Sequence, residues 1–332
     1  MQGISKFVTS RRNLLLGAGA FGLAASVPGG FAMRGHAATA QGADKPAAWY
    51  RFPIGDFEAT IVSDGRLNLG SALEQFPDAD PETVRRILDE EFLPVEPMML
   101  EQNAMILKTG DKLVLFDTGM GTAKTFGPAS GRLLDNIRAA GIDPAAIDAV
   151  ILTHAHLDHC WGIMADDDSR NFPNAQIYMS KADFDFWTDE GKLSASGFLP
   201  DFVRGARRNL IPNQDRMIFV ENEREVLPGI TALSTPGHTV GHTSYVIDSG
   251  GETYLFVGDV VHHYALLFRH PEWEFSFDTD PSQAAATRKA LFDRASSDRL
   301  TMIGYHFPFP GIGNIRPSGG AFTYVPKAMD LT

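Results

Sequence analysis

Residues 153–159 read Thr-His-Ala-His-Leu-Asp-His, and this stretch limits what the chain can fold into more than any other. An apolar run that predicts a buried strand comes directly before it. His154 and His156 are two residues apart, so an extended backbone points both imidazoles the same way. Asp158 and His159 follow as the chain turns toward a helix. These imidazole and carboxylate groups can hold two cations side by side, and both types of ligand suit Zn²⁺.

Three further candidate ligands lie downstream, each just after a predicted strand: His238, Asp259 and His306. Taken singly each is a weak signal, because a lone histidine after a strand is more often a capped or core residue. Together with the first cluster they form a consistent set, since strand ends can meet at one edge of a folded sheet. We therefore expect one metal centre built from both groups.

Apolar runs bounded by turn residues recur along the chain and predict nine strands. They cover residues 59–62, 104–108, 112–116, 149–153, 177–179, 230–233, 243–247, 254–257 and 300–303. Tight turns at 109–111 and 249–251 predict hairpins. Helices are expected at 82–92, 131–140 and 282–295, the first and last opened by Asp-Pro. Strands mixed with helices throughout indicate one α/β domain without a linker.

A weak internal repeat in the sequence suggests how these strands are arranged. A hairpin that ends in Leu-Phe-Asp-Thr-Gly at 115–119 recurs as one that ends in Leu-Phe-Val-Gly-Asp at 255–259. Two similar halves of this kind would form a sandwich of two sheets with their loops meeting at one edge. That edge is where the candidate ligands are expected.

The first 40 residues read as an export signal and are set aside from the fold. Ser10-Arg11-Arg12 precedes Leu14-Leu15-Leu16, and Ala38-Thr39-Ala40 offers small residues for cleavage, so the segment resembles a twin-arginine signal. We expect the twin-arginine export machinery to be a partner and the protein to be periplasmic or secreted. An uncleaved anchor is the alternative, since 14–33 carries no charge over a membrane-spanning length. Residues 41–332 then form one folded domain.

The charge balance excludes one class of partner. The chain has 29 basic and 41 acidic residues, for a formal charge of −12. Residues 1–40 contain four basic residues and no acid, so the remainder carries −16. Such a surface repels phosphate backbones, and nucleic acid is therefore not the expected partner. The single cysteine, Cys160, rules out an intrachain disulfide.

The spacing of the candidate ligands resembles the metallo-β-lactamase superfamily over almost the whole mature chain. Within it the chain is most similar to methyl parathion hydrolases and the related lactonases and aryl esterases. The segments that carry this resemblance are 55–58, 63–65, 112–119, 126–133 and 309–316. The resemblance implies an αββα sandwich, in which two mixed β-sheets are flanked by helices.

The resemblance also implies roles for the ligands. His154, His156 and His238 would bind one divalent metal ion, which we expect to be zinc. Asp158, His159 and His306 would bind a second, and Asp259 would bridge the two. A hydroxide shared by two such cations is available at neutral pH and attacks an acyl carbon or a phosphorus.

Other residues near these motifs receive supporting roles. Asp158 and Asp259 are expected to be catalytic as well as ligands. Related lactonases place a tyrosine three residues after the bridging aspartate to polarise the substrate carbonyl. This chain has His262 there, which can donate to an oxyanion or lie at the surface. His242 and Asp117 are expected to support the ligands by hydrogen bonds, and Cys160 to pack as a small apolar filler.

The substrate pocket is expected to be walled by aromatic side chains. Phe126, Trp187, Phe198 and Phe202 fall between the metal motifs, although each is as readily explained as core. Basic residues at 204, 207 and 208 are expected on a solvated helix face. They could instead form an anion clamp.

These features favour an exported binuclear metal hydrolase that cleaves lactones, aryl esters or organophosphate triesters. A small-molecule ester or lactone would then be its substrate. A class B-type β-lactamase is one alternative, and a non-catalytic periplasmic metal-binding protein is another. A glyoxalase-type thioesterase is disfavoured because only a short tail follows His306. The apolar segment 92–100 can serve a homodimer interface.

Overall fold

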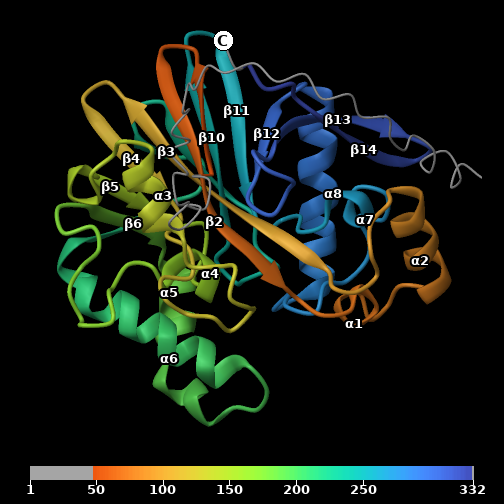
Figure 1. The fold of residues 1–332 in the computed structure, drawn as a ribbon, viewed down its shortest axis with the longest axis horizontal. Helices are drawn as coiled ribbons and strands as arrows, with labels where there is room; N and C mark the ends of the chain where they lie inside the picture. The colour runs from red at the N-terminus through yellow and green to blue at the C-terminus, as the bar shows by residue number, and fades with distance from the viewer. Residues whose placement is uncertain (1–47, 331–332) are drawn as a thin grey trace, which may run out of the picture. The chain divides into compact units, whose positions relative to one another are not determined.

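A computed structural model describes residues 48–330, and the predicted signal segment at 1–40 lies outside them. The described residues form two seven-stranded mixed sheets, each following chain order (Figure 1). The first sheet contains β1 (Trp49–Ile54), β2 (Phe57–Asn68), β3 (Met99–Thr109), β4 (Lys112–Phe116), β5 (Ala149–Ile151), β6 (Gln176–Ser180) and β7 (Met217–Val220). The second contains β8 (Glu225–Leu227), β9 (Ile230–Ser234), β10 (Thr243–Ser249), β11 (Glu252–Gly258), β12 (Thr301–Gly304), β13 (Ile312–Ser318) and β14 (Ala321–Pro326).

Helices flank the two sheets, with α3 and α5 beside the first and α8 against the second (Figure 1). The α-helices are α1 (Ala72–Gln75), α2 (Pro81–Glu90), α3 (Leu133–Ala139), α4 (Leu157–Cys160), α5 (Lys181–Thr188), α6 (Leu199–Leu210), α7 (Tyr264–Leu267) and α8 (Pro281–Ser297). Short 3₁₀ turns lie at Pro144–Ala146, Glu190–Ser194 and Ile211–Arg216. The predicted αββα sandwich is confirmed. Among residues 48–330 we find no helix with both the length and the apolar composition that crossing a bilayer requires.

The two halves share one topology, as the internal repeat predicts. In the first half the antiparallel hairpin β3–β4 is followed by β5, which pairs parallel to β4. In the second half the hairpin β10–β11 is followed by β12, which pairs parallel to β11. A parallel pair needs a crossover, and each crossover brings the next strand to end at the same edge as the one before it. That shared edge is where the candidate ligands lie.

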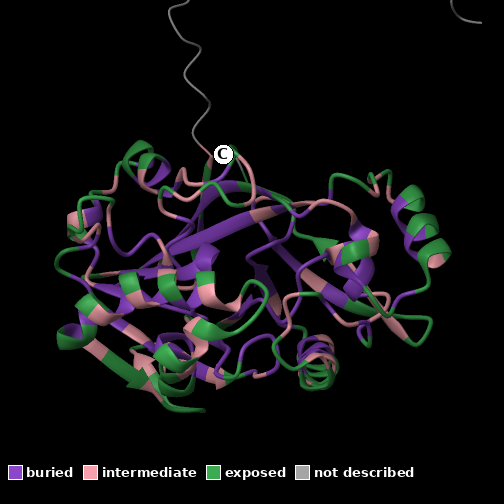
Figure 2. Ribbon diagram, turned by 90° about the horizontal axis from the view of Figure 1, so that it is seen from below, coloured by how far each residue is buried: buried purple, intermediate pink, exposed green. Residues whose placement is uncertain are grey.

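The core lies between the two sheets, where the strands are buried on both faces (Figure 2). Phe116 at the end of β4 packs on Phe256 of β11, with ring centroids 5.2 Å apart, and on Tyr245 of β10 at 5.8 Å. All three side chains are fully buried. Strands covered on both faces read as continuous apolar runs, which is why their sequences are easy to recognise.

All nine predicted strands are present, and five strands are found that the sequence analysis missed. Four of these, β1, β7, β8 and β14, are the outer strands of the two sheets, and β13 lies beside β14. Their side chains are largely half-buried or exposed, so the apolar pattern that marks a strand is weak.

The three predicted helices are present, with shifted ends. α2 begins as expected, since the Asp80 side chain accepts a hydrogen bond from the Thr83 amide at 2.8 Å. It stops at Glu90 rather than residue 92, and Phe92 takes a left-handed backbone conformation with φ of 58°. α8 begins in the same way, with Asp280 accepting from the Gln283 amide at 3.0 Å.

Candidate metal centre and substrate cavity

The first sheet supplies four of the predicted ligands from one short segment. His154 and His156 lie in the loop that leaves β5, and Asp158 and His159 lie in α4, which starts directly after His156. All four side chains are buried. The rings of His154 and His156 lie edge to face with centroids 4.7 Å apart, so both turn toward one point as the spacing predicts.

The second sheet supplies the other three ligands from three separate loops. His238 follows β9, Asp259 follows β11 and His306 follows β12. Each side chain is at most 3% exposed. The structure therefore brings together all seven residues that the sequence analysis nominated, although 152 positions separate the first from the last.

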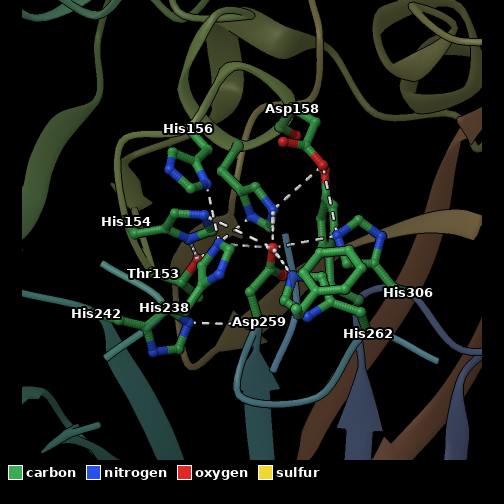
Figure 3. A network of polar contacts seen from close by, with 12 residues as sticks. Thr153, His154, His156, Asp158, His238, His242, Asp259, His262 and His306 are labelled. Atoms are coloured by element: carbon green, nitrogen blue, oxygen red, sulfur yellow. Dashed lines mark hydrogen bonds and ion pairs between the residues drawn. The ribbon is translucent and has the colours of Figure 1, made fainter. Parts of the chain in front are cut away.

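One carboxylate oxygen of Asp259 lies at the centre of the cluster (Figure 3). Five imidazole nitrogens surround this Oδ2 atom. Its distances are 3.7 Å to His154 Nε2, 3.3 Å to His159 Nε2, 3.3 Å to His238 Nε2, 3.1 Å to His262 Nε2 and 3.2 Å to His306 Nε2. An oxygen in contact with ligands from both predicted sites has the position that a bridging ligand requires.

The ligand atoms fall into two groups whose members lie within 4.8 Å of one another. His154, His156 and His238 make up the first. Asp158, His159, Asp259 and His306 make up the second.

The residues present fit divalent cations. Among their buried atoms, His154 Nε2, His159 Nε2 and Asp259 Oδ1 have no hydrogen-bond partner in the described structure. Leaving such atoms buried without a partner is costly, and a cation at their focus would satisfy them.

Protonation also favours a cation at this site. Burial, together with neighbouring histidines, lowers the pKa of His154, His156 and His238 well below the usual value, so these rings are neutral and present a lone pair. At His159 burial opposes the charge, but Asp259, Asp158 and Asp117 outweigh it and raise the pKa. The first group thus offers neutral nitrogen ligands. Around the second group, the carboxylates of Asp117, Asp158 and Asp259 favour positive charge at the site.

Hydrogen bonds from further residues hold the ligands in place. Asp117 lies 2.8 Å from His159 Nδ1 and also accepts from the amide and hydroxyl of Thr153. The backbone carbonyl of Glu101 accepts from His306 Nδ1 at 2.7 Å. In each case the far ring nitrogen is engaged, which leaves Nε2 free to point inward.

His242 contacts the backbone of Asp259 rather than the interior of the ligand cluster. Its Nε2 accepts a hydrogen bond from the Asp259 amide at 2.9 Å, and its Nδ1 faces the Thr235 hydroxyl at 2.8 Å. This approach requires glycine at 258, where φ is +55° and a Cβ would lie 2.6 Å from His242 Nε2. Cys160 is buried with its Sγ 3.4 Å from the Ala155 carbonyl oxygen, in line with its expected role as filler.

A small cavity opens over the metal cluster. The cluster forms its floor through His156, Asp158, His238, Asp259 and His306. Its walls are apolar and aromatic: Leu67, Leu69, Leu100, Phe126, Leu157, Phe202, Phe275 and Phe277. No lysine or arginine is among the residues that line it. Such a cavity suits a neutral molecule with an apolar portion.

His262 lies in the wall of this cavity and is not a surface residue. It is 2% exposed, its ring stacks on Phe275 with centroids 3.9 Å apart, and its Nε2 is 3.1 Å from Asp259 Oδ2. Its Nδ1 is buried and has no partner in the described structure. The alternative that His262 is a surface histidine is therefore wrong.

Two of the four predicted pocket aromatics lie elsewhere. Trp187 is 1% exposed and is packed behind the cluster, with its ring 4.7 Å from that of His156, because the inner face of α5 turns it into the core. Phe198 is 42% exposed and lines an adjoining groove with Phe126 and Phe202. Phe126 and Phe202 line both the groove and the cavity.

The three arginines of α6 form ion pairs near the surface, as the solvated-face prediction expects. Arg204 pairs with Asp201, Arg207 with Glu190, and Arg208 with Asp168 at 3.1 Å. Arg204 and Arg208 reach the adjoining groove, but none of the three lines the cavity over the metal cluster.

Several site residues were missed by the sequence analysis. Phe275 and Phe277 line the cavity, and the alternation of aromatic and polar residues over 273–277 was a usable signal for them. Asp278 contacts His238 Nδ1 at 2.9 Å. Tyr305 places its ring 4.1 Å from that of His159 and donates its hydroxyl to the Asp158 carbonyl. No local pattern marks these last two residues, because only the folded chain brings them to the ligands.

The profile of the metallo-beta-lactamase superfamily matches residues 99–306, which is more than half of the chain and ends at the last ligand. The chain therefore belongs to the metallo-beta-lactamase superfamily, and its two-sheet fold and histidine-aspartate cluster agree with this.

Individual relatives are lactonases and a hydrolase. An N-acyl homoserine lactonase of Bacillus sp is 29% identical over 118 residues, a match that spans 36% of this chain and 40% of the relative. Another, from Bacillus cereus, is 26% identical over 161 residues and is matched over 57% of its length.

Two solved structures resemble this chain over nearly their full lengths. AidC, a dizinc quorum-quenching lactonase in complex with a product, is 28% identical with a TM-score of 0.80, covering 85% of this chain and 98% of its own. The hydrolase AbOPH of the beta-lactamase superfamily is 30% identical with a TM-score of 0.79, covering 86% and 99%. These similarities show a metal-dependent hydrolase with lactonase relatives.

Proposed function

We propose that this protein is a binuclear, zinc-dependent lactonase that acts on neutral lactones carrying an apolar chain, with N-acyl homoserine lactones as the first candidates. The observation that carries the proposal is the pairing of the two ligand groups with an uncharged, aromatic-walled cavity directly above them. The similarity to a dizinc lactonase over most of both chains supports the same reaction and the same metal.

The metal centre and the side chains above it have separate tasks. Two divalent cations, when bound, would supply an activated water and a polarised ester carbonyl. His154, His156 and His238 would hold one cation, Asp158, His159 and His306 the other, and Asp259 both. Water adds to the carbonyl carbon, the ring C–O bond breaks, and the product is an open hydroxy acid.

The chain's own residues orient the substrate and handle its charge. The phenylalanine and leucine walls bind the apolar chain and exclude water from the reacting centre. His262 lies in the wall and is proposed to donate a hydrogen bond to the oxygen that becomes negative. Asp158, 5% exposed in the cavity floor, is proposed to accept the proton of the attacking water and pass it to the leaving oxygen.

Aryl esters and organophosphate triesters are alternative substrates for the same hydrolytic chemistry. Both are neutral, and both can fit an apolar cavity above two cations. The resemblance to methyl parathion hydrolases favours the phosphotriester version. The cavity is small and lined by bulky side chains, which favours a slender ester over a bulky tetrahedral phosphorus.

A substrate panel on zinc-loaded enzyme tests the proposal. It contains acyl-homoserine lactones, dihydrocoumarin, p-nitrophenyl acetate, paraoxon, methyl parathion and nitrocefin. The proposal expects the highest kcat/KM with the acyl-homoserine lactones. Highest activity on nitrocefin would instead favour a β-lactamase, and highest activity on paraoxon or methyl parathion a phosphotriesterase. No turnover of any member by protein with full metal content would favour the non-catalytic alternative.

We also propose that the protein is exported folded through the twin-arginine machinery. The support is the Ser10-Arg11-Arg12 motif, in a segment outside the described residues. Replacing Arg11 and Arg12 together by lysine is expected to keep the precursor uncut in the cytoplasm, as cell fractionation and blotting would detect. Normal periplasmic delivery of that variant would contradict the proposal.

A homodimer through the apolar segment 92–100 remains a prediction. Phe92, at the start of the segment, is 96% exposed, which is unusual for a large apolar side chain. Analytical ultracentrifugation of wild type and Phe92→Ser is the measurement. The prediction expects the wild type to sediment as a dimer and the variant to dissociate more readily.

A further inference from the structure

A buried guanidinium links helix α8 to the metal cluster. Arg288 is 0% exposed, although an arginine in a helix that packs against a sheet would ordinarily extend to solvent. Its Nε donates to the Val260 carbonyl at 2.8 Å, and its Nη1 donates to the carbonyls of Pro271 at 2.9 Å and Trp273 at 2.8 Å. Its Nη2 faces Asp278 Oδ2 at 3.4 Å. A charge this deep in a protein is costly unless each donor has a partner, and these contacts supply them.

Asp278 carries the contact from Arg288 to a predicted ligand. Its side chain is fully buried, and its Oδ1 lies 2.9 Å from His238 Nδ1. With Nδ1 as the donor to this carboxylate, His238 presents the lone pair of Nε2 to the cluster. Asp278 thus fixes both the tautomer and the orientation of the His238 ring.

The backbone around Asp278 clamps the same ligand. The Thr279 amide donates to the His238 carbonyl at 2.8 Å, and the Asp280 amide donates to the Gly237 carbonyl at 2.9 Å. Gly237 has φ of +131°, and a Cβ there would lie 2.2 Å from the Ala284 nitrogen in the first turn of α8. The helix is therefore packed directly against the turn that carries His238.

Arg288 also reaches the loop of a second ligand. Val260, whose carbonyl it binds, directly follows Asp259. One side chain therefore ties together the loop of the bridging carboxylate and the segment that orients His238. A single ion pair would be enough to balance the charge of Asp278, so the further contacts of Arg288 point to a role in holding these loops.

The other ligands are supported without Arg288. His159 rests on Asp117, directly after β4, and His306 rests on the Glu101 carbonyl in β3. His154 faces the Thr153 hydroxyl at 3.0 Å. Loss of Arg288 should therefore weaken the site of His154, His156 and His238 more than the site of Asp158, His159 and His306, where it acts on the shared Asp259 alone.

Asp278, His238 and His262 also lie close together, but Asp278 need not be a metal ligand. The three residues lie close enough to hold a cation. Asp278 Oδ1, however, contacts the far nitrogen of His238 and not the one that points to the cluster. Asp278 is therefore an orienting carboxylate rather than a ligand of a third ion.

We propose that Arg288 is a positioning residue of the metal centre, which acts through Asp278 on His238 and through Val260 on Asp259. The inference rests on the proposed function only in taking His238 and Asp259 as metal ligands. It makes no use of the substrate, so its test can fail or succeed independently of lactone hydrolysis.

The test measures metal binding by Arg288→Met and Asp278→Asn. Wild-type protein is expected to keep about two zinc equivalents against a competing chelator. Both variants are expected to lose one, with the affinity of the weaker site reduced by about 10- to 100-fold. Titration with cobalt(II) gives a second readout, because the visible spectrum of the first ion bound should match wild type while that of the second changes.

Arg216→Met is the matched control. Arg216 is also a buried arginine that donates to backbone carbonyls, those of Phe172 and Ala175, but it lies away from the ligands. Its loss should lower the melting temperature and leave both metal equivalents in place. Arg288→Lys should restore the site of His154, His156 and His238 only in part, because an ammonium cannot reach the carbonyls and Asp278 together.

The possible results separate the two claims. If Arg288→Met and Asp278→Asn keep both ions at wild-type affinity while the melting temperature falls, Arg288 is merely structural and the inference is overturned. If Arg288→Met fails to fold, the nearly isosteric Asp278→Asn decides in the same way. A wild type that binds two ions but hydrolyses no lactone contradicts the proposed function and leaves this inference standing.

Discussion

The most informative single residue outside the ligand set is His262. It contacts the Asp259 carboxylate, stacks on Phe275 and has one buried nitrogen without a partner in the described structure. A polar atom left in this state in the wall of a cavity needs either a ligand or a substrate atom to satisfy it. The apolar stacking partner holds the ring in place, so the imidazole need not reorganise during the reaction.

Replacing His262 by leucine should therefore lower kcat by about 10²-fold, because one preorganised donor to the developing negative charge is lost. His262→Gln keeps an N–H donor and should recover part of that loss. Steady-state kinetics on an acyl-homoserine lactone, with metal content measured in parallel, is the experiment. The metal content should stay at the wild-type level, and a variant that loses metal would show His262 to be a ligand instead.

At the scale of residues, the sequence could predict only those site residues that a local sequence pattern marks. The seven ligands lie in the segments that follow strands β5, β9, β11 and β12, so strand periodicity and residue type were enough to nominate them. Asp278 and Tyr305 depend on contacts between distant segments and leave no local pattern. Trp187 was misplaced for a related reason: the sequence located it near the site but did not determine which face of α5 it occupies.

At the scale of elements, the short helix α7 begins with a histidine cap. The Nδ1 of His263 accepts a hydrogen bond from the Leu266 amide at 3.4 Å, and this requires a neutral ring. Burial lowers the pKa of His263 from 6.5 to about 4. The cap should therefore make folding sensitive to acid.

The expected sign is a loss of stability as the pH falls. Above pH 6.5 the ring is neutral in both the folded and the unfolded chain. Between 6.5 and about 4 the unfolded chain takes up a proton that the folded one resists, so the free energy of unfolding drops by about 1.4 kcal/mol per pH unit.

His263→Asn keeps a good capping acceptor that does not titrate. Urea unfolding of wild type and variant over this range should show a shallower acid slope for the variant. Equal slopes in the two proteins would mean that the cap does not titrate as the burial of the ring requires.

At the scale of the whole molecule, the predicted ligands bridge the two sheets. Four come from the first sheet and three from the second, so a bound metal joins the halves of the sandwich. A ligand that binds only the folded state stabilises it by mass action, by about 4 kcal/mol at a thousandfold excess over Kd. Removing zinc with a chelator should therefore lower the melting temperature by roughly 10 °C.

The matched control for that measurement is Asp259→Ala, which removes the carboxylate at the centre of the cluster. The chelator should shift its melting temperature much less, because less metal is held at the start. Differential scanning fluorimetry with and without added zinc measures both proteins. An equal shift in the two would place the stabilising metal somewhere other than this cluster.

The charge of the whole molecule bears on which substrates reach the cavity. Outside residues 1–40 the chain carries a formal −16, and no lysine or arginine lines the cavity to offset this field locally. Arg204 and Arg208, which reach the adjoining groove, are already paired with acids. An anionic substrate should therefore be disfavoured both on approach and on binding.

The clearest comparison uses two esters of equal length, p-nitrophenyl hexanoate and the mono-p-nitrophenyl ester of adipic acid, which differ in a terminal carboxylate. The neutral ester should have a kcat/KM at least about 10-fold higher, and added salt should narrow the gap because it screens the repulsion. Phe202→Ala should also narrow it, since that side chain contributes apolar wall to the neutral chain alone. If the anionic ester is cleaved faster, and Arg204→Ala or Arg208→Ala abolishes that advantage, then the arginines of α6 act as an anion clamp and the neutral-substrate proposal is wrong.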